Sequence, residues 1–217
     1  MLFVWHDPAG GPPRFVLPEQ DMQGWSDWSL THRDFETGPV TIMQDLADTV
    51  HFESVHEYAD VEVLEGPCYQ GDSLSLSARF LWDTGLPGRL RGLPAAFQSR
   101  CHGLGYQCTE TQAVWGRYQT RHLVLPRPLG GGITRVYLGT SARIVGRAGQ
   151  LPGARLTRAL AQRFGELAFL RDIARDARMW EALPDHAAHA PDERIHAYQE
   201  WVRRFYTPQF EHGEREC

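Results

Sequence analysis

The sequence lacks the features that mark several common protein classes. Arg and Lys total 22 against 27 Asp and Glu, a net charge of −5, so the basic surface typical of nucleic-acid-binding proteins is missing. No apolar run approaches the roughly 20 residues that a helix needs to cross a bilayer. The N-terminal MLFVWHDPAGG lacks the basic start and long apolar stretch of a signal peptide. We therefore expect a cytoplasmic protein that neither binds nucleic acid nor spans a membrane.

Cysteine is also scarce. The four cysteines, Cys68, Cys101, Cys108 and Cys217, form no C-x-x-C pair, which argues against a zinc ribbon or a thioredoxin-like site. Cys101 and Cys108 could bridge neighbouring strands, but free buried thiols are the better expectation in a cytoplasmic chain. With 217 residues, 42% of them hydrophobic, the chain is long enough to form one domain with a sizeable core.

Hydrophobic periodicity predicts an irregular N-terminal region followed by a helix. Residues 1–6 are expected to form a strand, and a turn-rich, Trp-rich stretch continues to about Thr37. From 43 to about 58 the pattern is helical, because Leu46 and Val50 recur at helical spacing among polar residues.

The remainder predicts a sheet and then a long helix. Residues 61–82 alternate around Gly71-Asp72 and predict a hairpin, and three more strands are expected at 97–111, 117–128 and 134–145. Consecutive strands favour an antiparallel sheet, so the predicted class is α+β. A long helix at about 157–183 and a shorter one at about 192–205 follow. The long helix has an apolar stripe formed by Leu160, Phe164, Leu167, Leu170, Ile173, Ala177 and Trp180.

One segment has the composition of a metal site. Asp48, His51 and His56 form the pattern D-x-x-H-x-x-x-x-H. Two imidazoles and a carboxylate would leave open positions on iron(II) for dioxygen beside a substrate. With ten His in the chain, a pair five apart arises by chance in roughly a third of such sequences, so two unrelated histidines are the alternative. On a regular helix five positions span about 140°, so the imidazoles converge only if the helix ends or bulges between them.

A carboxylate on the long helix could complete the site. Phe169, Ile173, Asp176 and Trp180 share one helical face, which places Asp176 within an apolar stripe. A buried carboxylate is costly unless it is paired or bound to metal. Asp176 is therefore the candidate third ligand, with a buried salt bridge to an Arg of the sheet as the alternative. Asp172, one turn earlier, is expected to be a solvated surface charge.

The order of these features resembles a known family. A strand LFVWHDP, the D-x-x-H-x-x-x-x-H motif, a sheet, a helix ending in D-x-x-x-W and a final Y-x-x-W-x-x-x-F-Y follow one another over residues 1–206. This order is similar to the oxygenase (alpha) component of Rieske non-haem iron oxygenases, especially the branch of 3-ketosteroid 9α-hydroxylase and cholesterol 7-desaturase. The resemblance implies a helix-grip (Bet v 1-like, SRPBCC) fold, in which a curved antiparallel sheet wraps around a long C-terminal helix.

The resemblance also implies roles for individual residues. His51, His56 and Asp176 would bind the mononuclear Fe²⁺, and Asp48 would link the iron site to the Rieske cluster of a neighbouring subunit. Asp45 stands where relatives often have Asn. Residues expected to line the substrate pocket, although each could equally be an ordinary core residue, are Phe52, Val55, Phe97, Tyr106 and Phe169.

The family's N-terminal Rieske domain has no counterpart in this sequence. Neither the Cys-x-His nor the Cys-x-x-His pair that holds a 2Fe–2S cluster occurs. We expect residues 1–15 to be a remnant of the last Rieske strand and a linker, 16–206 to be the catalytic domain, and 207–217 to be a disordered tail. The cluster would then lie in a domain encoded upstream or on a separate partner chain. Alternatively, this chain has lost redox function.

The leading functional expectation is an iron(II) monooxygenase or dioxygenase. It would use O₂ to hydroxylate or desaturate a hydrophobic, ring-containing, steroid-like substrate. Electrons would come from a Rieske protein or ferredoxin with its reductase, and a homotrimer is the assembly that the resemblance implies. The alternative is a redox-inactive helix-grip domain that binds a hydrophobic small molecule. A purely structural subunit is disfavoured, because it would have no reason to keep Asp176 on an apolar face.

Overall fold

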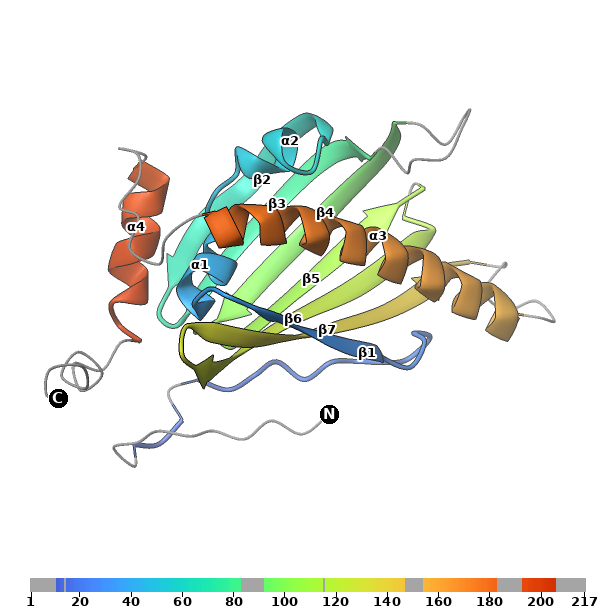
Figure 1. Ribbon diagram of the computed structural model, residues 1–217. Coiled ribbons are helices and arrows are strands. Elements are labelled where there is room, and N and C mark those ends of the chain that lie inside the picture. Colours follow the sequence, from blue (N-terminus) through green and yellow to red (C-terminus); the bar gives the residue numbers. More distant parts are fainter. Residues whose placement is uncertain are drawn as a thin grey trace, which may run out of the picture.

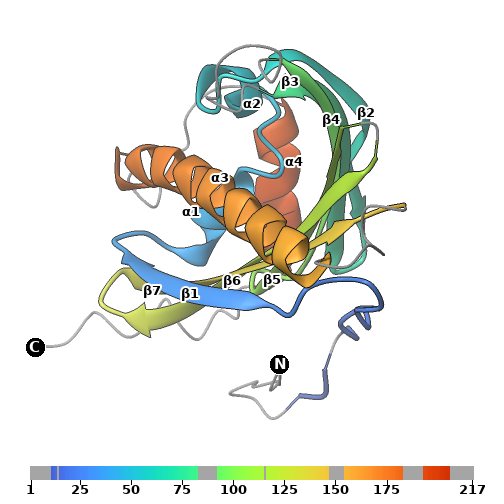
Figure 2. The same ribbon diagram turned by 90° about the vertical axis from the view of Figure 1, so that its right-hand side faces the viewer.

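One curved sheet and one long helix organise the chain (Figures 1 and 2). The computed structural model describes residues 11–13, 15–82, 92–114, 116–146, 154–182 and 193–205. Within them the elements are, in chain order, β1 Ser29–Phe35, α1 Pro39–Gln44, α2 His51–Ser54, β2 Ala59–Gln70, β3 Ser73–Trp82, β4 Leu93–His102, β5 Tyr106–Ala113, β6 Tyr118–Gly130, β7 Ile133–Ile144, α3 Ala154–Ala182 and α4 Glu193–Val202.

The strands form a seven-stranded antiparallel sheet in the order β1-β7-β6-β5-β4-β3-β2. Only β1 leaves the sequential order, because it pairs with β7 and extends the sheet at that edge. Helix α3 lies across the concave face, and the sheet curls around it (Figure 2). The predicted α+β class and the helix-grip architecture are confirmed.

Three local predictions were wrong. Strand β1 was missed because its sequence SLTHRDF has little hydrophobic alternation, and only Phe35 is fully buried. The predicted strand 97–111 contains a hairpin, since β4 ends at His102 and Gly103 begins the turn with φ 55°. The predicted helix 43–58 contains only the end of α1, which stops at Gln44, and the short helix α2, with a turn between them. The strand expected at residues 1–6 lies outside the described residues.

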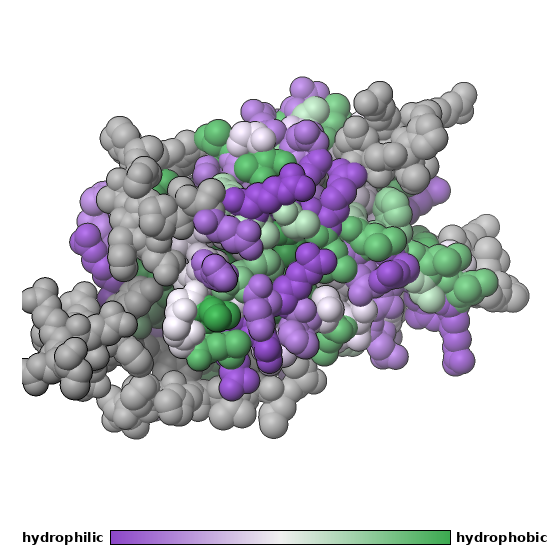
Figure 3. Space-filling view, in the orientation of Figure 1, coloured by the Kyte–Doolittle hydropathy of each residue, from purple (hydrophilic) through white to green (hydrophobic). Residues whose placement is uncertain are grey.

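Helix α3 buries a narrower stripe than its sequence predicts. Gly165, Ile173, Asp176 and Trp180 are buried, whereas Leu160 and Leu167 are 63% and 53% exposed. Leu156, on the same half of the helix, is also exposed. Figure 3 shows hydrophobic side chains on the surface where the N-terminal half of α3 lies. The stripe is narrow because a single layer of sheet covers only one side of the helix.

Two core clusters hold the helix-grip arrangement together. One lies between α3 and β6–β7, where Trp180 packs edge-on against Phe35 at 5.2 Å between ring centroids. The other lies beneath α1, α2 and α4 and includes Met43, Phe52 and Trp201. The Trp201 indole N–H donates to the Gly71 carbonyl at 3.0 Å, which fixes α4 to the β2–β3 turn.

The described cysteines and helices agree with two further expectations from the sequence. Cys101 and Cys108 are buried free thiols, as predicted, Cys68 is also free, and Cys217 lies outside the described residues. Among the helices that the structure describes, none is both long and apolar enough to cross a membrane.

The closest approach of α3 to the sheet leads to a stability prediction. A Cβ added at Gly165 would lie 2.6 Å from the Tyr118 hydroxyl oxygen and 2.8 Å from Thr120 Cγ2. Although Ala has the better helix propensity, we expect Gly165→Ala to lower the free energy of unfolding by about 1–3 kcal/mol through overpacking. Urea denaturation measures the change.

Ala159→Gly is the matched control, since Ala159 is exposed on the same helix. This control should lower the free energy of unfolding by about 1 kcal/mol through the loss of helix propensity alone. If Gly165→Ala instead stabilises the protein by a similar amount, the close contact does not constrain the helix.

Candidate metal centre

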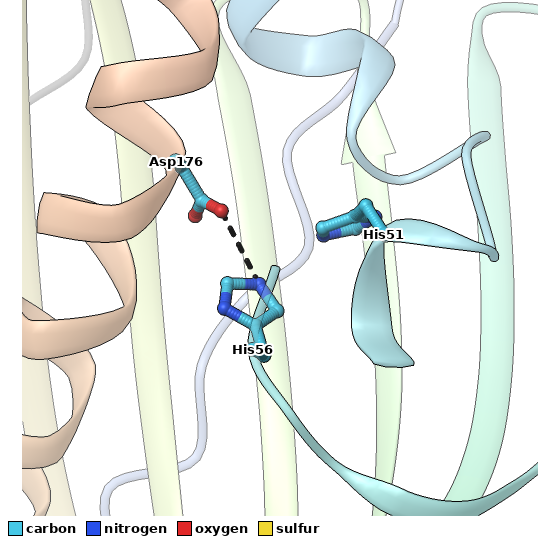
Figure 4. A group of neighbouring side chains, drawn as sticks. All are labelled: His51, His56 and Asp176. Carbon is cyan, nitrogen blue, oxygen red and sulfur yellow. Dashed lines mark ion pairs between the residues drawn. The ribbon is translucent and has the colours of Figure 1, made fainter. Parts of the chain in front are cut away.

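The three candidate ligands come together in space. His51 begins α2, His56 follows the end of α2, and Asp176 lies in the last third of α3. One donor atom from each lies within 4.8 Å of the other two, and all three residues are buried. Figure 4 shows the two imidazoles and the carboxylate facing one another across the gap between α2 and α3.

The histidines converge because the helix ends between them. Helix α2 stops at Ser54, and the N–H groups of Val55 and His56 both donate to the His51 carbonyl, at 2.7 and 3.3 Å. Glu57 then adopts a left-handed conformation with φ 59°, which turns the chain away from the helical path. The imidazole centroids consequently lie 4.9 Å apart. The helix therefore ends between His51 and His56, as the convergence of their imidazoles requires.

His51 is held by the main chain of Asp48. Its Nδ1 hydrogen-bonds with the Asp48 carbonyl oxygen, which leaves Nε2 as the nitrogen available to a metal. The Asp48 carboxylate instead accepts the Val50 N–H at 3.1 Å. Asp48 thus contacts the His51 ring through its peptide group rather than through its side chain.

His56 lies between two carboxylates. Its Nε2 is 3.3 Å from Asp176 Oδ1, and its Nδ1 is 3.8 Å from Asp172 Oδ1. Nδ1 of His56 and Oδ1 of Asp176 are buried without a hydrogen-bond partner among the described residues. The Arg175 guanidinium donates to the His56 carbonyl at 2.6 Å and pairs with Glu57, so it does not neutralise Asp176 directly.

The expectation that Asp172 is a solvated surface charge is wrong. Its side chain is only 17% exposed, and the Tyr58 hydroxyl donates to Oδ2 at 2.8 Å. Positions four apart on a helix lie on nearly the same face. Asp172 therefore points to the same side as Asp176, and this placement could have been deduced from spacing alone.

Electrostatics around the site favour neutral side chains in the absence of a cation. Burial and the neighbouring Asp172 raise the pKa of Asp176 to about 8, and burial raises the pKa of Asp172 to about 6. Burial, together with His51 and Arg175, lowers the pKa of His56 to about 3. Burial and Asp176 also raise the pKa of Asp45, although the Trp180 indole donates to Asp45 at 2.8 Å.

This donor set fits a divalent first-row metal. Two imidazole nitrogens and one carboxylate oxygen are the ligands of the facial triad that suits iron(II). Asp176 Oδ1 is buried without a hydrogen-bond partner among the described residues, and a cation bound there would compensate the cost of burying it. Such an ion would also reverse the local pKa shifts, because it stabilises the carboxylates and the neutral imidazoles.

A cavity opens beside the three residues, between α3 and the sheet. Its volume is about 160 Å³, several times what one water molecule needs. Phe52, Phe97 and Phe169 line it. Val55 and Tyr106, also expected in the pocket, do not. Tyr106 packs with Cys108 and Leu123 on the opposite face of the sheet, because alternate strand residues point to opposite faces.

Several lining residues were not singled out from the sequence. On the sheet they include Ser99, Gln107, Thr109 and His122, and nearer the histidines they include Tyr58, which stacks on Phe80. Strand alternation could have identified the inward positions, but only once the correct strand boundaries were known.

The raised pKa of Asp176 predicts how the metal-free protein responds to pH. An acid whose folded pKa is raised from 3.8 to about 8 stabilises the fold at low pH, and this stability is lost as pH rises to 8. His56, with its pKa lowered to about 3, acts in the opposite direction only below about pH 6.5. Between pH 6.5 and 8 we therefore expect a loss on the order of 1–2 kcal/mol.

Urea denaturation of chelator-treated protein at several pH values measures this loss. Asp176→Asn should reduce the dependence across that window, and Asp45, whose pKa burial also raises, accounts for any fall that remains. A wild-type profile that already matches Asp176→Asn would contradict the raised pKa.

Comparison with known proteins assigns the chain to a family. Residues 4–206 match the family model described as the 3-ketosteroid 9α-hydroxylase C-terminal domain. The oxygenase component of 3-ketosteroid-9-alpha-monooxygenase from Rhodococcus rhodochrous is 34% identical over 61 residues, which cover 26% of this chain and 16% of that protein. The alignment thus spans a small part of the length of that relative.

Solved structures support the same fold at low identity. Dicamba monooxygenase has a TM-score of 0.60 at 13% identity, covering 95% of this chain and 66% of that chain. NdmA from Pseudomonas putida CBB5 has a TM-score of 0.50 at 13% identity, covering 87% and 53%. Ara h 8.0201 has a TM-score of 0.53 at 7% identity, covering 74% and 100%. The chain belongs to the 3-ketosteroid 9α-hydroxylase C-terminal domain family.

Proposed function

We propose that this domain holds one Fe²⁺ ion at His51, His56 and Asp176. It would use O₂ to hydroxylate or desaturate a hydrophobic, ring-containing, steroid-like molecule. The observation that carries the proposal is the convergence of three buried donor side chains at the wall of a cavity. Membership of a family whose relatives are monooxygenases supports it.

The chain's own residues would prepare the metal site. Iron(II) bound there would supply open coordination positions and the redox chemistry that oxygen activation requires. The Asp48 carbonyl fixes the tautomer and orientation of His51, so that Nε2 is presented to the metal. Asp172 stands near Nδ1 of His56, where a protonated Nδ1 would face it. Asp176 would offset one positive charge of the ion.

The aromatic part of the cavity would hold the ring system of the substrate. Phe52 and Phe97 pack edge-to-face at 5.2 Å between centroids, and both line the cavity beside His51 and His56. Rigid rings such as these bury a large apolar area and exclude water from the reacting position. A substrate carbon would thereby be placed next to the iron.

Electrons would enter from a Rieske protein or ferredoxin with its reductase, at the surface next to α2. Val50 is 54% exposed there, and the Asp48 peptide connects this surface to the His51 ring through one hydrogen bond. A 2Fe–2S cluster would belong to that partner or to a preceding domain. Assembly as a homotrimer and location in the cytoplasm stay predictions.

A redox-inactive binding domain is the second candidate. The same fold occurs in Ara h 8.0201, so the cavity by itself would serve a binding role equally well. The buried, unpartnered donors favour the oxygenase, because a pure binding cavity would gain stability by replacing Asp176 with an apolar residue.

Iron content tests the metal site. After anaerobic loading with Fe²⁺ and desalting, the wild-type protein should retain about one iron per chain. His51→Ala, His56→Ala and Asp176→Ala should each weaken iron binding by more than about tenfold, since each removes a ligand rather than a supporting group. His32→Ala is the matched control, because His32 lies exposed on β1. A wild-type protein that retains no iron would rule out the centre.

Oxygen uptake tests the chemistry and the role of Asp48. With androst-4-ene-3,17-dione, a ferredoxin reductase and a Rieske ferredoxin, iron-loaded protein should consume O₂. Asp48→Ala should keep its iron, because the His51 bond comes from the main chain. It removes the carboxylate that accepts the Val50 N–H and so loosens the peptide that carries the proposed path, and its uptake should fall by about tenfold or more. Glu53→Ala, an exposed acid on α2, is the control. Steroid binding by iron-loaded protein without any oxygen uptake would favour the binding domain.

A further inference from the structure

A row of polar side chains runs across neighbouring strands on the sheet side of the cavity. Ser99 on β4, Thr109 on β5, His122 on β6 and Thr140 on β7 are successive register partners. Ser99, Thr109 and His122 line the cavity, where a purely apolar ligand would be served best by apolar side chains. The feature is therefore a hydrogen-bonding track across an otherwise aromatic pocket, and we call these four residues the polar row.

The polar row is bonded at both ends and interrupted in the middle. The hydroxyls of Ser99 and Thr109 are 2.7 Å apart, and the amide nitrogen of Gln107 donates to Ser99 at 3.1 Å. At the other end, His122 Nδ1 and the Thr140 hydroxyl are 3.2 Å apart. Between Thr109 and His122 the residues that the structure describes show no side-chain hydrogen bond, although these two face each other in register.

His122 can bind a neutral group at the position between Thr109 and itself. The His122 ring stacks on Phe169 of α3, with the centroids 4.3 Å apart, and this contact fixes the orientation of the His122 ring. Nδ1 is engaged by Thr140, and Nε2 makes no hydrogen bond with any described residue. Burial lowers the pKa of His122 to about 3, so the ring is neutral and can present either a donor or an acceptor to a ligand.

The lining offers no cationic side chain to an anionic ligand. Three acids, Asp45, Asp172 and Asp176, line the cavity, no Arg lines it among the described residues, and the sequence contains no Lys. A carboxylate on the ligand would therefore find no cationic side chain of this chain near the polar row. A ketone or hydroxyl oxygen carries no charge and matches the hydrogen-bonding capacity of Thr109 and His122.

We propose that the break in the polar row, between Thr109 and His122, is the site that recognises a neutral ketone or hydroxyl oxygen of the substrate. His122 Nε2 makes the principal hydrogen bond, and the Thr109 hydroxyl, backed by Ser99 and Gln107, makes the second. Substrate selection thus depends on hydrogen bonds between an oxygen atom of the substrate and residues of the sheet. The proposed metal ligands lie on the other side of the cavity, near α2 and α3. The inference rests on the proposed function only in treating this cavity as the substrate site.

Matched ring compounds bound to metal-free protein provide the test. The probes are 2-decalone, 2-decalol and decalin, which share one skeleton and differ in the oxygen. Dissociation constants come from calorimetry and from the fluorescence of Trp82 and Trp180, both of which line the cavity. His122→Phe keeps a ring against Phe169 while removing both nitrogens. It should weaken binding of the ketone or the alcohol by about threefold to tenfold and leave decalin unchanged.

A pair of identical substitutions on one strand controls for cavity shape. Thr109→Val should weaken the oxygenated probes selectively. Thr111→Val, two residues along β5 and also in the lining, should not, because Thr111 pairs with Phe97 and Thr120 rather than with His122. An unchanged ratio of ketone to decalin affinity in His122→Phe would overturn the proposal, and so would failure of both oxygenated probes to bind the wild-type protein. Since no metal is present, either result is independent of whether the iron site forms.

Discussion

The architecture depends on how closely α3 can approach the sheet. At Gly165 the helix backbone lies against Tyr118 and Thr120 with no room for a side chain, and at Trp180 a large ring packs against Phe35. The two contacts are separated by about 22 Å at 1.5 Å per residue. Between them Ile173 packs with Val124 and Val136 of β6 and β7. On the side that faces β3, β4 and β5, the cavity separates the helix from the sheet. The site exists because the helix packs on one part of the curved sheet and not on the other.

The same arrangement places acids where water cannot solvate them. Asp172 and Asp176 project from α3 into the cavity wall, and Asp45 lies beneath Trp180. Arg175, the nearest cation, is engaged by Glu57 and by a backbone carbonyl. Such a cluster opposes folding of the metal-free chain, and perturbed groups of this kind concentrate at functional sites. A divalent cation would convert the same cluster from a destabilising feature into a stabilising one.

The helix-grip fold does not by itself decide the chemistry, since it is shared by dicamba monooxygenase and by Ara h 8.0201. The chemistry depends on the side chains that the fold directs into the cavity. Here the α2 and α3 side supplies imidazoles and carboxylates, while the sheet supplies the polar row beside aromatic rings. The cavity therefore has two chemically distinct walls, one suited to a metal and one to a neutral oxygenated ring compound.

The sequence alone determined the class of the fold, the long helix, most strands and the three residues of the candidate centre. Periodicity reports which face of one element is apolar, so Asp176 stood out within its stripe, and the same rule would have placed Asp172 beside it. Periodicity does not report which elements face one another. The end of α2 between His51 and His56, the position of Tyr106 on the outer face and the alignment of Thr109 with His122 all depend on turns and strand register. Tertiary packing decided these, because a shift of one residue in a strand moves every side chain to the opposite face.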